Sequence, residues 1–194
     1  YTATVFSNMG VFYDKVGDHD EALKHFQLAR KIYAELGYKE GSIHNLNNIG
    51  ALYINSGDYG SAEKVLMEAV DLARTIQDRE DEGTALTAIG DLHLQRKDYR
   101  KALSYYEQAL TLSRKIGHKS MEGTLRLHIG KLNLKMQNFD LALSNFKRAL
   151  EIGKRMDAFT LTYESLGGIA SVEEKQTRYD EAIQHYLQAI EKIE

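Results

Sequence analysis

The chain is predicted to be all-α, built from five antiparallel helix pairs, because one pattern recurs along its whole length. Small residues recur every forty positions, at Gly10, Gly50, Gly90, Gly130 and Ala170. The sequence also contains no proline, the residue that most often interrupts a helix. A fixed period of this length is typical of repeat architectures in which each unit is a helical hairpin.

Three further columns keep the same register and define the second helix of each pair. Alanine stands at positions 22, 62, 102, 142 and 182, and again at 29, 69, 109, 149 and 189. Between them lie bulky residues: Phe26, Leu66, Tyr106, Phe146 and Tyr186. The spacing of i, i+4 and i+7 puts the three columns on one helix face. Alternation of small and large residues on that face lets two helices interdigitate.

These columns place the helices in order. First helices are predicted near 2–15, 40–55, 80–95, 120–135 and 160–175, and second helices near 19–36, 59–76, 99–116, 139–156 and 179–194. The turns within the pairs are Gly17-Asp18, Gly57-Asp58, Lys97-Asp98, Gln137-Asn138 and Thr177-Arg178. Asp or Asn is expected to cap the helix that follows. The last turn offers Arg178 instead and is expected to be the weakest.

The repeats occupy approximately 1–37, 38–77, 78–117, 118–157 and 158–194. Because one helical hairpin alone cannot bury its apolar stripe, the repeats are expected to stack into a single domain. The pattern starts and stops inside helices, which suggests a piece of a longer protein. The exposed terminal helices are expected to permit self-association.

The amino-acid composition limits the classes of partner that the chain is expected to bind. Twenty-five Lys and Arg against twenty-eight Asp and Glu give a net charge of −3, without the basic excess of a nucleic-acid binder. No apolar run of eighteen residues is present, so no membrane insertion is expected. The absence of cysteine excludes disulfides. A cytoplasmic location is favoured, although a periplasmic protein of this kind can also lack cysteine.

The repeated residues resemble the tetratricopeptide repeat family. Residues 9–13 (MGVFY), residues 22–26 (ALKHF) and Ala29 follow the family pattern of L-G-x-x-Y, A-x-x-x-F and A. The chain differs from it in its forty-residue period and its missing proline, and the usual tryptophan position holds Phe6, Leu46, Leu86, Arg126 and Leu166. The longer period is similar to Pins-type polarity adaptors and to bacterial regulators and sensors of the Rap and MalT type. The resemblance implies a right-handed superhelix.

No catalytic constellation is found. The seven histidines include no H-E-x-x-H motif and no pair with ligand spacing on one helix face, so no metal site is predicted. Gly167-Gly168 lies within a predicted helix rather than in a phosphate-binding loop, and no cofactor is expected. Gly153 and Gly167-Gly168 are interpreted as sites of close helix packing; the alternative is a soft joint between the fourth and fifth repeats. The chain is not expected to be an enzyme.

The resemblance implies that the first helix of each pair lines a concave groove for a partner segment. Carrying the family's groove positions over gives the candidate residues Asn47, Asn48, Asn55, Asp91, Gln95, Lys131 and Lys135. Lys131 and Lys135, with Arg126 nearby, are suited to hold a carboxylate; the alternative is that they are solvated surface residues. Among the positions of the family's carboxylate clamp only Asn48 matches, so binding of that kind is not expected.

The function predicted from this groove is a protein–protein or protein–peptide interaction module. The alternative is a sensory input domain of a bacterial signalling protein, in which a ligand in the same groove changes the curvature of the array and drives an attached effector. The sequence leaves the identity of the ligand open.

Overall fold

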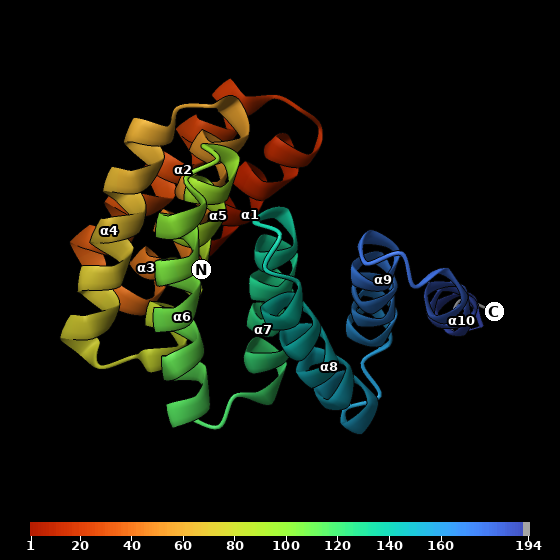
Figure 1. Cartoon of the computed structure of the whole chain (residues 1–194). Coiled ribbons are helices and arrows are strands. Elements are labelled where there is room, and N and C mark those ends of the chain that lie inside the picture. The colour runs from red at the N-terminus through yellow and green to blue at the C-terminus, as the bar shows by residue number, and fades with distance from the viewer. Residues whose placement is uncertain (192–194) are drawn as a thin grey trace. The chain divides into compact units, whose positions relative to one another are not determined.

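The computed structural model describes residues 1–191, which form ten α-helices in succession (Figure 1). The helices are α1 (Thr2–Lys15), α2 (His19–Leu36), α3 (Lys39–Ser56), α4 (Tyr59–Ile76), α5 (Arg79–Gln95), α6 (Tyr99–Lys115), α7 (Lys119–Lys135), α8 (Phe139–Arg155), α9 (Phe159–Lys175) and α10 (Tyr179–Ile190). Successive helices pack in pairs, as the forty-residue period predicts: α1 with α2, α3 with α4, α7 with α8 and α9 with α10, while His93 of α5 stacks on Tyr105 of α6. The all-α class and the five helix pairs are therefore confirmed.

The predicted helix bounds agree with the structure to within one residue for α1 to α9. Helix α10 ends at Ile190, earlier than predicted, and positions 192–194 of the prediction lie outside the described residues. The contacts divide the chain into two compact units, residues 1–105 and 106–194, with α6 contributing to both. Each unit is described by itself.

The small residue in the first helix makes room for the bulky residue of the second. A Cβ atom added to Gly10 would lie 2.6 Å from the ring of Phe26, and one added to Gly130 would lie 2.7 Å from the ring of Phe146. Both distances are shorter than van der Waals contact allows. The repeated glycine thus permits the close helix approach that the sequence pattern predicts.

The turns within the pairs are capped as predicted in three of the five cases. Asp18 accepts a hydrogen bond from the backbone N–H of Glu21, and Asp58 and Asp98 accept from the residues three positions further on. The predicted cap by Asn138 is wrong, because its side-chain amide donates to Oδ1 of Asn133 at 3.2 Å instead. Arg178 makes no capping hydrogen bond, in agreement with the expectation for the last turn.

Each unit has its own apolar core. The largest fully buried side chains of the first unit are Phe26, Ile43, Leu46, Leu66, Ile89 and Leu92, and those of the second are Tyr106, Leu125, Leu132, Phe146, Leu166 and Ile169. Helix α10 leaves five large apolar side chains exposed, those of Tyr179, Ile183, Tyr186, Leu187 and Ile190. Self-association through this face stays a prediction. None of the helices in the described part of the chain combines the length and apolarity needed to cross a membrane.

Two of the three unusual glycines lie at close helix contacts. A Cβ atom on Gly153 would lie 2.8 Å from Oγ1 of Thr162, and one on Gly168 would lie 2.5 Å from the ring of Phe146. Gly167, by contrast, has open space where its Cβ would be. Close packing therefore accounts for Gly153 and Gly168 but not for Gly167.

A buried histidine in the first unit is expected to make folding sensitive to pH. His93 is 1% exposed, its ring stacks on Tyr105, and neither ring nitrogen has a hydrogen-bond partner among the described residues. Burial lowers the pKa of His93 below its usual value near 6.5, although the carboxylate of Glu63 opposes this shift. The folded chain thus prefers neutral His93, while the unfolded chain takes up a proton below that value. The stability conferred by the neutral ring is present above pH 6.5 and is lost as the pH falls through the folded-state pKa.

Replacing His93 with phenylalanine should remove this sensitivity, because the ring stacking is kept and the titrating ring nitrogens, which lack hydrogen bonds among the described residues, are lost. Below pH 6 the variant is expected to exceed the native chain in stability by about 1–3 kcal/mol. Urea unfolding measured between pH 7.5 and 5 tests this. Equal loss of stability in both chains as the pH falls would contradict it.

Candidate binding surface

The candidate residues of the second and third repeats lie on α3 and α5, which pack against each other in the first unit. Asn55 and Gln95 are exposed, whereas Asn48 and Asp91 are half-buried. Both side-chain amide atoms of Asn47 are buried, without a hydrogen-bond partner among the described residues. Asn47 therefore lies at the base of this helix face, and Asn55 and Gln95 are the candidates that solvent reaches most freely.

The two candidate lysines lie on α7 in the second unit and differ in their surroundings. Lys131 is exposed and forms an ion pair with Glu164 of α9. Lys135, also exposed, lines a hollow of about 360 Å³ together with Phe139 and Lys175. Arg126, which the sequence suggests as their neighbour, instead binds Glu122. Pairing with Glu164 means that a ligand carboxylate would have to compete for Lys131.

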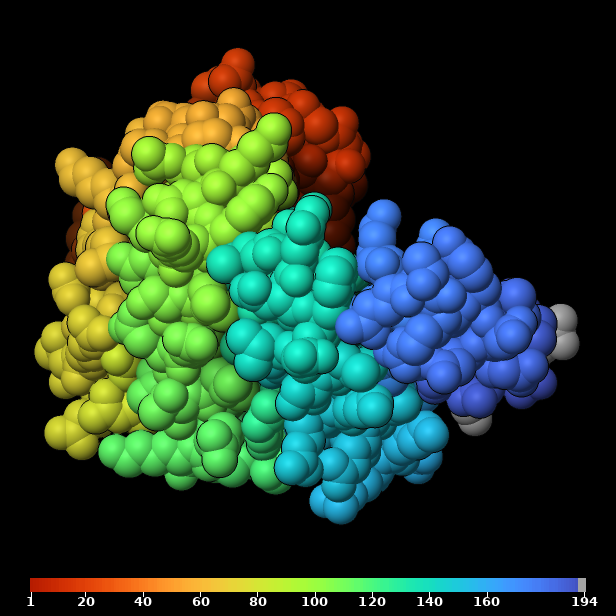
Figure 2. All heavy atoms as spheres, viewed as in Figure 1, coloured from red at the N-terminus to blue at the C-terminus, as the bar shows by residue number. Residues whose placement is uncertain are grey.

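A hollow of about 370 Å³ opens between α7 and α9, which are both first helices of their pairs. Ser120, Thr124 and His128 line it from α7, and Phe159, Thr160 and Glu164 line it from α9. Figure 2 shows the atoms of α9 packed against those of α7 and α8.

The rim of this hollow carries an aromatic pair. Phe159 is 48% exposed and stacks on Tyr163, with ring centroids 6.3 Å apart. Exposed aromatic rings beside hydroxyl groups can bind an apolar side chain and hydrogen-bond the backbone that carries it.

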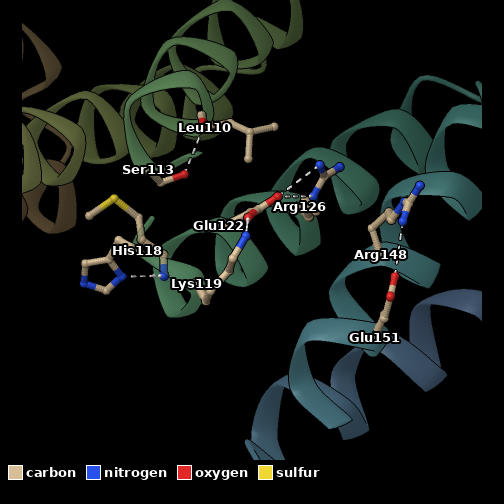
Figure 3. Close-up of polar contacts among 9 residues, drawn as sticks. Leu110, Ser113, His118, Lys119, Glu122, Arg126, Arg148 and Glu151 are labelled. Atoms are coloured by element: carbon tan, nitrogen blue, oxygen red, sulfur yellow. Dashed lines mark hydrogen bonds and ion pairs between the residues drawn. The ribbon is translucent and has the colours of Figure 1, made fainter. Parts of the chain in front are cut away.

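A second hollow, of about 420 Å³, lies between the end of α6, the first half of α7 and the last turns of α8. We call it the basic hollow, because its charged side chains are those of Arg114, Lys119, Arg126, Arg148 and Arg155 with only Glu122 and Glu151. Figure 3 shows Lys119 and Arg126 directed at Glu122, and Arg148 directed at Glu151. The groove positions carried over from the resemblance missed this site. Its one signal in the sequence was Arg126, which occupies a column that is apolar in every other repeat.

The glutamate at the base of the basic hollow is held in its charged form. Glu122 is 6% exposed and accepts hydrogen bonds from Lys119 at 2.9 Å and from Arg126 at 3.2 Å. Burial opposes its ionisation, but Lys119 and Arg126 outweigh this effect and hold the pKa of Glu122 below its ordinary value. The glutamate therefore stays ionised at neutral pH and fixes two of the cations in place.

The equivalent glutamate of the preceding repeat shows the same balance. Glu82 accepts hydrogen bonds from Arg74 and Arg79, both at 2.7 Å, and its pKa is lowered by these two cations against the effect of burial. Within residues 1–191, no group of three or more His, Asp or Glu side chains is placed to hold a metal ion.

Comparison with solved structures gives several similar folds at low sequence identity. One similar structure is a signal-transduction ATPase of the STAND type with a tetratricopeptide repeat sensor, from Pyrococcus horikoshii. Its sequence is 19% identical and its TM-score is 0.85, and the match covers 98% of this chain and 29% of that protein. BtubC from P. vanneervenii is 17% identical with a TM-score of 0.85, over 96% of this chain and 78% of that one.

Aspartyl phosphate phosphatase F from Bacillus subtilis is 13% identical with a TM-score of 0.75, over 99% of this chain and 60% of that one. The chain thus spans less than two thirds of the STAND protein and of the phosphatase. At these identities the similarity establishes the fold alone. A comparison with curated protein sequences finds no significant match.

The family is established by the sequence itself. The tetratricopeptide repeat model matches residues 1–75, 42–115, 81–155 and 120–194, and these overlapping matches together extend over the whole chain. The matched residues contain the helix pairs and the small and bulky columns described above. The chain therefore belongs to the tetratricopeptide repeat family.

Proposed function

We propose that this chain is a protein-interaction module that binds an extended segment of a partner along the first helices of its repeats. Tetratricopeptide repeats are in general protein-interaction modules. The candidate contacts are the exposed polar side chains of α3, α5 and α7: those of Asn55, Gln95, Lys131 and Lys135, with Asn48 and Asp91 half-buried beside them and Asn47 at the base.

The observation that supports this proposal most strongly is the hollow between α7 and α9. It lies on two first helices, it is large enough for an amino-acid side chain, and its rim carries the exposed ring of Phe159. Its other walls offer the hydroxyls of Thr124 and Thr160. A partner segment would place an apolar side chain in this hollow and pair its polar groups with the hydroxyls and with Lys131.

A peptide library displayed on phage tests the proposal directly. Peptides selected on the native chain are titrated against a Thr124→Arg variant, whose long side chain would fill the hollow, and against Thr75→Arg as a control on α4. Thr124 and Thr75 are both exposed. We expect Thr124→Arg to weaken binding by about tenfold or more and Thr75→Arg to leave it unchanged. Equal binding by both variants would refute a peptide site in the hollow between α7 and α9.

The role of Lys131 needs its own control, because its ion pair with Glu164 would be broken by charge reversal alone. Lys131→Glu is therefore compared with the double variant Lys131→Glu, Glu164→Lys, in which the pair is restored in the opposite sense. If the selected peptides contact Lys131 through a carboxylate, both variants lose affinity. Recovery in the double variant would mean that the ion pair serves the packing of α7 on α9 instead.

A second candidate function is that of a ligand-sensing input domain. It is favoured by the match to part of the STAND protein, described as carrying a tetratricopeptide repeat sensor, of which this chain spans only 29%. The two functions differ in mechanics. A sensor changes its radius of gyration when a selected peptide binds, as small-angle scattering would record, whereas an adaptor keeps the same radius.

A further inference from the structure

The basic hollow is unusual for this chain in its charge. Five cations face two carboxylates there, although the whole sequence carries a net charge of −3. The two carboxylates each hold two of the cations. Lys119 and Arg126 bind Glu122, and Arg148 and Arg155 bind Glu151 at 3.2 and 2.7 Å. Each cluster therefore keeps an excess of one positive charge.

The repeats themselves show that this charge is not needed for folding. The same five positions one repeat earlier hold Arg74, Arg79, Leu86, Gln108 and Lys115; two repeats earlier they hold Ala34, Lys39, Leu46, Glu68 and Thr75. One repeat later the first four hold Lys154, Phe159, Leu166 and Gln188. Only the set in the basic hollow is cationic throughout.

Arg126 is the most informative of the five. Its column is otherwise apolar, and Leu46, Leu86 and Leu166 are almost fully buried there. Nor is an arginine required in this column to neutralise a buried glutamate. In the preceding repeat the equivalent glutamate, Glu82, is bound by Arg74 and Arg79, while Leu86 occupies the column. A leucine would bury more apolar surface at this position, so Arg126 gives up packing for a charge directed into the hollow.

We propose that the basic hollow binds an acidic segment of a partner polypeptide, with two or more neighbouring Asp or Glu side chains entering it. Four of the five cations are arginines, whose planar guanidinium groups bind carboxylates through two hydrogen bonds. The positive charge lies in two clusters, one around Glu122 and one around Glu151, which suits separate carboxylates better than one compact phosphate. The side chains of Ile152 and Met156 supply an apolar wall for the methylene groups of the segment.

This surface is formed by the last turns of α8, the first half of α7 and Arg114 at the end of α6, and it lies outside the hollow between α7 and α9 that carries the proposed peptide site. Met156 borders both hollows, but no charged side chain lines both. The two proposals can therefore succeed or fail independently.

Fluorescence anisotropy with a labelled peptide of alternating Glu and Ser tests the inference on the 194-residue chain, with a Gln and Ser peptide as the neutral comparison. The test variant carries Arg126→Leu, Arg148→Gln and Arg155→Thr, each the residue found at the same position of another repeat. The control variant loses the same charge elsewhere, through Lys31→Thr, Lys64→Gln and Arg100→Gln, all at exposed positions. Thermal unfolding followed by circular dichroism shows that both variants are folded.

We expect the native chain and the control variant to bind the Glu peptide alike, and the test variant to bind it about tenfold more weakly or not at all. The Gln peptide should not bind. Equal loss of affinity in both variants would overturn the proposal, because binding would then follow net charge rather than the hollow. Displacement of the peptide by inorganic phosphate, or tighter binding of a single-stranded oligonucleotide, would also overturn it.

Discussion

Replacing Phe146 with alanine is expected to lower the free energy of unfolding of the second unit by about 3–5 kcal/mol. The ring of Phe146 is fully buried, and the positions where Cβ atoms of Gly130 and Gly168 would stand lie 2.7 and 2.5 Å from it. Helices α7 and α9 approach this ring most closely at these two glycines, and Leu127, Ile169 and Val172 share the same apolar core. Because glycine has no side chain to move into the vacated space, the cavity left by alanine would stay largely unfilled.

Phe159→Ala is the matched control, since it removes an equal ring that is 48% exposed. We expect it to cost less than about 1 kcal/mol, because little apolar surface is returned to water. Chemical denaturation of both variants, followed by circular dichroism, measures the difference. Similar losses of stability in the two variants would contradict the central position of Phe146 in the core.

Replacing Gly168 with alanine is expected to destabilise the chain by about 1–3 kcal/mol, even though alanine is the better helix former. The added methyl group would lie 2.5 Å from Cε1 of Phe146. That ring is enclosed and also lies against Gly130, so it has little room to retreat. The clash must then be relieved by a shift of α9 away from α8.

The neighbouring glycine is the control for this prediction. Gly167 has nothing within 4 Å of its missing Cβ, so Gly167→Ala should stabilise the helix by about 0.5–1 kcal/mol. In addition, Phe146→Leu combined with Gly168→Ala should cost less than the sum of the two single changes. If Gly168→Ala raised the melting temperature as much as Gly167→Ala, close packing would not explain Gly168.

The helices of this chain follow from the sequence because their cause is local and repeated. The columns headed by Gly10, Ala22 and Phe26 recur in a fixed register, and each recurrence confirms the others. The exceptions are side chains with a choice of partner. Asn138 has the right residue type and position for a cap, yet its side-chain amide donates a hydrogen bond to Asn133 instead. Asn133 has an equally short side chain, and in this turn the two side chains lie within hydrogen-bond distance of each other.

The binding surfaces were less predictable because their contacts join residues far apart in the sequence. The pairing of Lys131 with Glu164 crosses from one repeat to the next, and nothing in the spacing of charges singles it out. Arg126 was visible as an exception to an apolar column. That it shares a hollow with Arg148 and Arg155, however, depends on how α8 packs against α7.

The position of Phe146 also bears on how the second unit melts. One ring serves as the contact surface for its own repeat, through Gly130, and for the next repeat, through Gly168. When α9 detaches, the ring loses one of its two supports, and the pairing of α7 with α8 is weakened at the same moment. Stability in arrays of repeats depends on such nearest-neighbour terms. We therefore expect the fourth and fifth repeats to be coupled through this ring and to unfold together.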